Sequence, residues 1–292
     1  MNTEKNTLRE TVSRENSPIP FYVYKQNWIN CNLYLHWHNE VEFIYVEKGK
    51  IIFNINTVPI KVSEGEAIII NSGSLHSANC VKDVPSIHHA ILFDLNILNS
   101  SYDDYYQTKY IKPLLDGELK FPLIIDKENP WGKSIISELK EIINIHDNKL
   151  IAWELDLKIS IYKILSIFIK ENNLAFKDGL DSSKLGNKID IIKKILNYIH
   201  KNYMSKIYIE DLAKEVNMNP QYFCRFFKNN ISKTPVEYIN EYRINKAVKI
   251  IQTEDKRILD ICFEVGFDNF SYFIKKFKEY KGVTPNKYKK LV

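Results

Sequence analysis

The stretch of sequence that decides the fold occurs twice in the carboxyl-terminal third of the chain. Residues 211–218 read DLAKEVNM, and residues 260–267 read DICFEVGF. The block YFCRFFK at 222–228 is matched by YFIKKFK at 272–278, and TPVEY at 234–238 by TPNKY at 284–288. Three matched blocks in the same order indicate that one structural unit is repeated.

Each copy predicts a helix, a short turn and a second helix. In the first copy a helix is expected from Ile209 to Val216, and Asn219 then provides an N-cap with Pro220 at the first helical position. In the second copy Asn269 takes the cap position. This is the pattern of a helix-turn-helix motif, whose second helix can enter the DNA major groove. A long helix predicted from 236 to 252 would fix the spacing between the two motifs.

The second helix of each copy has one polar face and one apolar face. Phe223, Phe226 and Phe227 form the apolar stripe of the first copy, and Tyr272, Phe273 and Phe277 that of the second. Arginine can bind guanine through two hydrogen bonds, glutamine can read adenine, and lysine neutralises phosphates. An isoleucine can contact the methyl group of thymine. The alternative is a solvated face without a partner. The predicted DNA-contacting residues are Gln221, Cys224, Arg225, Lys228, Ser271, Ile274, Lys275 and Lys276.

The charge of the chain is divided unequally. Residues 187–292 hold 21 Lys and Arg against 12 Asp and Glu, whereas residues 1–186 hold 20 against 24. The net charge of +5 is therefore the sum of an acidic part and a basic part. Such a split favours a nucleic-acid or membrane partner for the carboxyl-terminal part, and the alternative is ordinary variation of the surface charge. Only 5 of the 41 basic residues are arginine, which makes each arginine a candidate for bidentate hydrogen bonding to a partner.

The sequence before the repeat predicts a β-rich domain followed by two helices. Short β-rich runs separated by turn residues suggest a sandwich or small barrel. These runs are 21–23, 33–37, 42–46, 50–55, 67–70 and 87–93. Apolar residues at helical spacing then predict helices over 131–146 and 152–172. These two amphipathic helices either pack on the barrel or pair with a second copy of the chain, and the pattern leaves both open.

A set of polar residues in the β-rich domain has the spacing of a ligand site. His36 and His38 are two residues apart and so share a face of a strand, while Glu42 follows closely and His76 comes from a distant strand. Three histidines and one carboxylate can hold a divalent metal ion. The same side chains could instead bind a polar effector, or simply bond to the barrel wall. His88 and His89 are adjacent and should face opposite ways.

The repeat resembles the DNA-binding domain of AraC/XylS-family transcription regulators. The matching residues are Asp211–Ala213, Phe227, Lys228, Thr234, Pro235, Tyr238, Arg243, Ala247, Asp260, Ile261, Val265–Phe267, Tyr272, Phe273, Phe277, Lys278, Gly282, Thr284, Pro285 and Tyr288. Cys262 and Asn217 depart from the usual Ala and Gly. The resemblance implies two motifs that insert into adjacent major grooves. The histidine motif resembles that of cupin barrels, with Asn71 in place of the usual Pro, and in that family such a barrel binds an effector.

Together these features predict an α+β protein with two domains: a cupin-like β-barrel with appended helices, and an all-α domain with two helix-turn-helix motifs joined by a linker helix. The expected organisation is an arm over 1–20, an effector-binding and dimerisation domain over 21–175, a linker over 176–187, and a DNA-binding domain over 188–292. The predicted function is sequence-specific regulation of transcription, controlled by a small molecule that is bound at His36, His38, Glu42 and His76. The resemblance to this family suggests a sugar as the effector. The alternative is a metal-dependent cupin enzyme or a metal sensor fused to a DNA-binding domain.

The same reasoning predicts the partners and the compartment. Promoter DNA, a small effector, a second copy of the chain and, for an activator, RNA polymerase are the expected partners. No apolar run approaches the length needed to span a bilayer, and residues 1–17 lack the apolar core of a secretory signal. Four cysteines far apart in the sequence are not a disulfide scaffold. These features predict a cytoplasmic protein.

Overall fold

The computed structural model describes residues 19–291, except for 30–31, 82 and 177–179. Most of the predicted arm, Cys31 and part of the predicted linker therefore lie outside the described residues. The chain divides into two compact units, with the boundary between Gly186 and Asn187. Among the described residues, no helix has both the length and the apolar character needed to cross a membrane.

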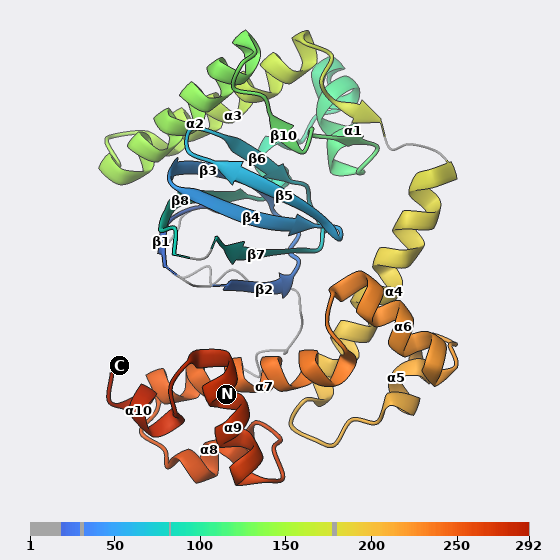
Figure 1. Cartoon of the computed structure of the whole chain (residues 1–292). Coiled ribbons are helices and arrows are strands. Elements are labelled where there is room, and N and C mark those ends of the chain that lie inside the picture. The colour runs from blue at the N-terminus through green and yellow to red at the C-terminus, as the bar shows by residue number, and fades with distance from the viewer. Residues whose placement is uncertain (1–18, 30–31, 82, 177–179, 292) are drawn as a thin grey trace. The chain divides into compact units, whose positions relative to one another are not determined.

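The amino-terminal unit is built on two antiparallel sheets that face each other (Figure 1). The five-stranded sheet has the order β1 (Phe21–Trp28), β8 (Ser86–Phe93), β3 (Val41–Lys48), β6 (Ala67–Ile70) and β10 (Ile124–Ile125). The four-stranded sheet has the order β2 (Asn32–His36), β7 (His76–Cys80), β4 (Lys50–Ile55) and β5 (Val58–Ser63). A small pair is formed by β9 (Leu119–Lys120) and β11 (Ala175–Phe176). The predicted cupin-like architecture is confirmed, and β4 and β6 have the predicted bounds.

The five-stranded sheet is buried on both faces. Along β3, Ile44 and Val46 point into the apolar cluster between the sheets, whereas Phe43 and Tyr45 point to the other side. Because successive side chains of a strand alternate between faces, one strand serves two cores. Glu42 shares the inward face of Ile44, so its carboxylate lies on the side of the sheet that faces the sandwich interior.

Helices cover the outer face of the five-stranded sheet. The short elements η1 (Leu95–Leu98), η2 (Gln107–Ile111) and α1 (Lys112–Leu115) precede the long helices α2 (Pro130–Asn148) and α3 (Trp153–Lys170). In Figure 1 α2 and α3 lie side by side on the sheet. The predicted apolar stripe of α3, which includes Leu157, Ile161 and Leu165, is buried against it. Packing on the β-domain therefore accounts for this stripe. A second apolar stripe of α3 remains exposed.

The carboxyl-terminal unit is helical throughout its regular elements. These are α4 (Leu180–Asn202), α5 (Ile209–Glu215), α6 (Pro220–Ile231), α7 (Pro235–Thr253), α8 (Ile258–Glu264), α9 (Phe270–Lys281) and α10 (Pro285–Lys289). Two helix-turn-helix motifs, α5–α6 and α8–α9, flank the linker helix α7, as predicted. The structure differs from the prediction at α4, which begins inside the predicted linker. No proline interrupts residues 180–187, and a helix extends readily from the apolar turns that follow.

Capping side chains set where the second helix of each motif begins. The Oδ1 atom of Asn219 accepts a hydrogen bond from the backbone N–H of Tyr222 at 2.8 Å, and Asn269 does the same for Tyr272 at 2.8 Å. Each bond satisfies one N–H group that has no partner within the helix. Thr234 and Glu237 form a capping box at the start of α7. The turns before α6 and α9 contain Asn217 and Gly266, both with positive φ.

Candidate functional site

The first candidate site is the exposed face of α6. Phe223 and Phe227 are fully buried and turn this helix so that the opposite side faces solvent. Gln221, Arg225 and Lys228 are exposed there, and Cys224 is half-buried at the edge. The structure thus places all four predicted residues of the first motif on one accessible surface. This surface offers one amide group, one guanidinium and one ammonium, which are the groups that read base edges and neutralise phosphates.

The equivalent face of α9 is similar but not identical. Ser271 and Lys275 are exposed, and Ile274 is half-buried against the core of the second motif. Lys276 is the exception among the predicted residues, because its ammonium group already pairs with the carboxylate of Glu279 at 2.9 Å. The side chain of Lys276 is only 17% exposed. A charge that is paired within the protein has less to offer to a phosphate.

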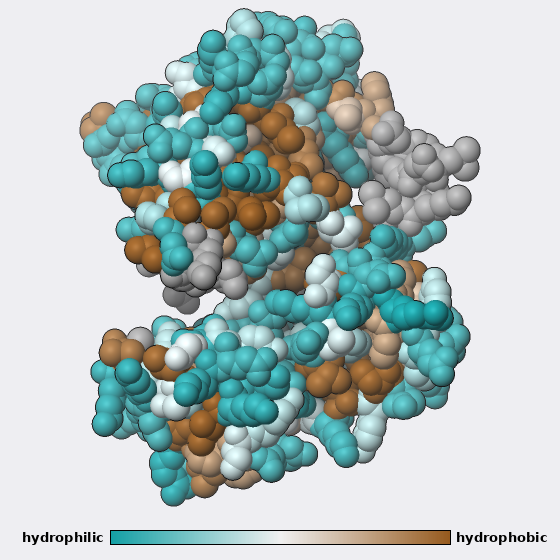
Figure 2. Space-filling view, viewed as in Figure 1, coloured by the Kyte–Doolittle hydropathy of each residue, from teal (hydrophilic) through white to brown (hydrophobic). Residues whose placement is uncertain are grey.

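Two tyrosines at the start of these helices were not singled out by the sequence as surface residues. Tyr272 was assigned to the apolar stripe, but it is 39% exposed and its hydroxyl accepts a hydrogen bond from Asn240 of α7 at 2.9 Å. Tyr222 takes the equivalent place on α6 and is 50% exposed. The repeat itself carried this signal, since both positions hold a tyrosine one residue after Gln221 or Ser271. On the view in Figure 2, hydrophobic residues form small separate patches on a largely hydrophilic surface of this unit.

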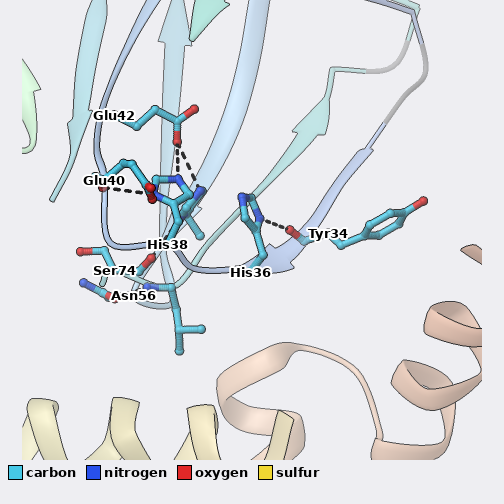
Figure 3. A network of polar contacts seen from close by, with 9 residues as sticks. Tyr34, His36, His38, Glu40, Glu42, Asn56 and Ser74 are labelled. Carbon is cyan, nitrogen blue, oxygen red and sulfur yellow. Dashed lines mark hydrogen bonds and ion pairs between the residues drawn. The ribbon is translucent and has the colours of Figure 1, made fainter. Parts of the chain in front are cut away.

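The second candidate site lies at one end of the β-sandwich and contains residues from both sheets. His36 and His76 are direct partners on the neighbouring strands β2 and β7, and their ring centroids are 4.0 Å apart. His38 follows β2, with its ring 4.9 Å from that of His76. Glu42 comes from β3 in the facing sheet. Its Oε2 atom lies 3.3 Å from Nε2 of His38 (Figure 3) and 3.3 Å from Nε2 of His76. The structure therefore brings the four predicted residues together.

The backbone fixes which nitrogen of each ring faces the site. The Nδ1 atoms of His36, His38 and His76 lie 2.8, 3.0 and 2.9 Å from backbone carbonyl oxygens. A carbonyl can only accept, so each Nδ1 carries the proton and donates it. A neutral ring bonded in this way presents an unprotonated Nε2 to the site. The nearest ligand nitrogens of the three rings all lie within 4.8 Å of one another.

The electrostatics of the cluster agree with this arrangement. Burial alone would raise the pKa of Glu42, but His38 and His76, when they carry a proton on Nε2, donate hydrogen bonds to its carboxylate, outweigh burial and hold that pKa well below its usual range. Burial lowers the pKa of His76 to about 4, so this ring is neutral at neutral pH. The site therefore combines a carboxylate with lone pairs on imidazole nitrogens, all of which are acceptors. Such a group of acceptors is stabilised by a cation or by a ligand with several donors. The three histidines could hold a metal ion.

Hydrogen bonds hold the loops around the cluster in place. The side-chain amide of Asn71 both donates to the carbonyl oxygen of Phe121 and accepts from its N–H, each at 2.9 Å. Gly73 donates to the carbonyl oxygen of His38 at 2.8 Å. Asn56 accepts from the N–H of Leu75 at 3.1 Å and so attaches the loop before His76 to the β4–β5 turn. The departure from the cupin pattern at Asn71 thus replaces a rigid proline with two hydrogen bonds.

His88 is a further polar residue of the sandwich interior, and the sequence did not identify it. It is 2% exposed, lies on the inward face of β8 with Ala90 and Leu92, and its ring meets that of Trp28 edge-on at 4.8 Å. Within the described part of the chain, neither Nδ1 of His88 nor Oγ of the fully buried Ser86 has a hydrogen-bond partner. His89 faces the other way and contacts Glu47 at 2.7 Å. The prediction that the two histidines face opposite sides is confirmed.

Comparison with known proteins identifies the domain in which each candidate site lies. A helix-turn-helix domain model matches residues 212–291, and a cupin domain model matches residues 32–89. The chain is 30% identical over 288 residues to the uncharacterized HTH-type transcriptional regulator YdeC of Bacillus subtilis, covering 97% of this chain and 96% of that protein. It is 23% identical over 265 residues to the melibiose operon regulatory protein of Escherichia coli, covering 88% and 83%. Among solved structures, fatty-acid-bound ToxT of Vibrio cholerae is 17% identical with a TM-score of 0.46, covering 94% and 96%.

The chain therefore belongs to the AraC family of helix-turn-helix transcriptional regulators with an N-terminal cupin domain. These relatives are transcriptional regulators and not enzymes, which removes the support for the enzyme alternative. DNA binding is implied by the helix-turn-helix domain.

Proposed function

We propose that this regulator binds a specific promoter sequence through α6 and α9 and that a small molecule in the β-sandwich controls its activity. The observation that carries the first part is the pair of capped helices whose exposed faces contain Gln221, Arg225, Ser271 and Lys275. Buried phenylalanines hold both faces outward, so each can enter a groove without unfolding the motif. The cytoplasm is the compartment that fits such a role.

Selection of DNA from a pool tests this function directly. Full-length protein is incubated with a pool of random duplexes at near-physiological salt, and the bound fraction is amplified and sequenced. We expect a site with two short conserved elements about one helical turn apart, bound at least about 1,000-fold more tightly than random DNA. Recovery of no sequence motif, or equal affinity for selected and random duplexes, contradicts the proposal.

The effector is proposed to be a small polyhydroxylated molecule such as a sugar. His88 and Ser86 are buried polar groups whose unpaired atoms face an apolar interior, and such groups are costly unless a ligand supplies their partners. Burial lowers the pKa of His88 to about 4, so the neutral ring can both donate and accept a hydrogen bond. The ring of Trp28 beside it offers an apolar face. The name of the melibiose operon regulatory protein agrees with a sugar ligand.

A divalent metal ion is the second ligand proposed for the sandwich. Three Nε2 atoms and a buried carboxylate converge at its His36 end, and the backbone has already oriented each ring. His36, His38 and His76 would hold the ion, with Glu42 beside two of them. A bound ion would join β2, the segment that follows it and β7, and could polarise hydroxyl groups of an effector.

A thermal-shift panel on the full-length protein separates these ligands. Zinc, manganese and a set of mono- and disaccharides are added singly, and a true ligand at about 100 times its Kd should raise the Tm by about 2–4 °C. The metal shift should disappear in His38→Ala, and the sugar shift in Ser86→Ala and His88→Gln. His89→Gln is the matched control, because His89 lies on the opposite face of the same strand. A shift that persists unchanged in the matching variants rules out the assigned site.

The same chain is proposed to act as a homodimer through α3. Leu155, Ile159 and Tyr162 are 63%, 52% and 37% exposed and follow the spacing of four and three residues that defines a helix-pairing seam. Ile151 at the preceding turn is 99% exposed. The hydroxyl of Tyr162 donates to the carbonyl oxygen of Leu98 at 3.2 Å, which connects this stripe to the exposed tyrosines that follow η1. Exposed apolar and tyrosine side chains in one region are typical of protein interfaces.

Charges beside the stripe favour an antiparallel pair. Acidic residues, including Asp156, lie in the first turn of α3, whereas Lys163 and Lys170 lie in its second half. A two-fold axis near Ile159 would bring Asp156 of one copy to Lys163 of the other. A parallel pair would place like charges side by side. Lys163 is 54% exposed and already lies 3.3 Å from Glu138 of its own chain, so the second copy would add to an existing ion pair.

A further inference from the structure

The end of α4 makes direct contact with the second helix-turn-helix motif. Tyr203, which follows α4, belongs to the apolar core of that motif with Ile261, Phe273 and Phe277. In the turn between α8 and α9, a Cβ atom on Gly266 would lie 2.3 Å from the carbonyl oxygen of Tyr203. Only glycine fits this contact, and its φ of +89° also requires glycine. The segment that enters the first motif is therefore packed tightly against the second.

Arg243 of α7 forms hydrogen bonds across this junction. Its Nε donates to the carbonyl oxygen of Tyr203 and its Nη2 to that of Ser205, each at 2.8 Å. Its guanidinium carbon lies 5.6 Å from the ring centroid of Phe267. This one side chain of α7 thus contacts both the loop after α4 and the turn of the second motif. Lysine could not replace it, because only the planar guanidinium presents two donors in fixed directions.

The contacts of Arg243 continue into the second recognition helix. The ring of Phe267 packs against Phe273 and Tyr272 of α9 at centroid distances of 5.2 and 6.1 Å. Tyr272 is held in turn by Asn240, which is 5% exposed and lies one turn before Arg243 on α7. A shift of the guanidinium would therefore reach α9 through two packed rings.

The opposite side of α7 is attached to the first motif. His200 of α4 stacks on Tyr242 with a centroid distance of 3.7 Å and hydrogen-bonds to the hydroxyl of Tyr238 at 3.1 Å. The ring of Tyr238 meets Phe227 of α6 edge-on at 5.8 Å. Helix α7 therefore contacts α6 through Tyr238, α9 through Asn240, and the turn before α9 through Arg243. The two recognition helices are connected by packed side chains as well as by the chain itself.

We propose that Arg243 is a positioning residue that fixes the second recognition helix relative to the first, so that the domain accepts its two DNA elements at one separation only. The proposal rests on the proposed reading of DNA by α6 and α9. The proposal predicts that replacing Arg243 changes how binding affinity depends on the distance between the two DNA elements. An arginine that only stabilised the fold would change the affinity for all duplexes equally. An inserted base pair moves the second element by about 35° around the DNA axis and about 3.4 Å along it. A rigid domain cannot follow this movement without losing contacts.

The test measures Kd for the full-length protein on the duplex selected from the random pool and on versions with one base pair added or removed between its two elements. We expect wild type to bind the altered duplexes about tenfold more weakly or worse. Arg243→Gln should bind the original duplex more weakly and discriminate less than about threefold among the spacings. Arg257→Gln is the control, since that arginine is 82% exposed and pairs only with Asp260 in the contacts described. It should retain wild-type discrimination.

Two outcomes overturn the proposal. Either an equal loss on every duplex or wild-type behaviour of Arg243→Gln shows that Arg243 does not set the separation. If Arg243→Gln does not fold, as judged by circular dichroism, Arg243→Lys replaces it. Lysine keeps the charge and the alkyl chain but lacks the two fixed donors of the guanidinium. Wild-type discrimination among the spacings in Arg243→Lys would also contradict the proposal. Failure of wild type to select any DNA would contradict the proposed function instead, and the two failures are therefore distinguishable.

Discussion

Replacing Arg225 by alanine should weaken binding to the selected duplex by about 5- to 150-fold and should relax the base preference at one position of the first element. This range corresponds to the loss of a two-pronged arginine–guanine contact of about 1–3 kcal/mol. Arg225 is the central residue of the exposed face of α6, between Gln221 and Lys228. Measuring Kd against all single-base variants of the element shows whether the loss is confined to one position.

Lys228→Ala provides the comparison on the same helix. A lysine that contacts a phosphate contributes almost equally to every sequence, so this variant should lose affinity uniformly and reduce the slope of log Kd against log salt by about 1. If Arg225→Ala behaves in this way, Arg225 binds the backbone of DNA and does not read a base. If Arg225→Ala has no effect, α6 is not the reading helix.

Replacing Ile159 by lysine should convert the proposed dimer to a monomer. The residue lies at the centre of the exposed stripe of α3, and a two-fold axis near it would place the two new ammonium groups next to each other in an apolar seam. We expect the dimer Kd to rise by about 100-fold or more, as for central interface residues. Sedimentation equilibrium of both proteins over a range of concentrations measures this change.

Val58→Lys is the matched control, because Val58 is 54% exposed on β5 of the same unit and outside the stripe. It should leave the assembly unchanged. Asp156→Lys and Lys163→Asp should each weaken the antiparallel dimer, and the double variant should restore part of the loss. A wild-type protein that is monomeric at all concentrations contradicts the dimer, and absence of rescue in the double variant contradicts the antiparallel arrangement.

The helical half could be predicted closely from the sequence because its boundaries are marked by specific chemistry. Asn219, Pro220 and Asn269 are strong helix-start signals, and the two copies of the repeat supported each other. The β-half was predicted less completely. Strand β5 was missed because Pro59 lowers its strand signal, although an edge strand tolerates proline. Residues 107–111 adopt a π-helix, which has no reliable sequence pattern.

The candidate ligand site could also be predicted only in part from the sequence. His36, His38, Glu42 and His76 could be grouped because two motif spacings are short and local. His88 could not be assigned, because alternation along a strand shows only that it and His89 face opposite ways and not which of them faces the interior. That choice depends on which face of β8 meets the second sheet. Likewise, the pairing of Lys276 with Glu279 could be judged only from the packed helix.

The two recognition helices hold different side chains at matching positions: Cys224 and Arg225 on α6, and Ile274 and Lys275 on α9. If these residues read DNA as proposed, one chain does not recognise the same sequence with both motifs, and its binding site is asymmetric and has a direction on the duplex. Turning the site end for end would present each motif with the wrong half. Reversing the site on the duplex would therefore reverse the orientation of the bound regulator relative to the start of transcription.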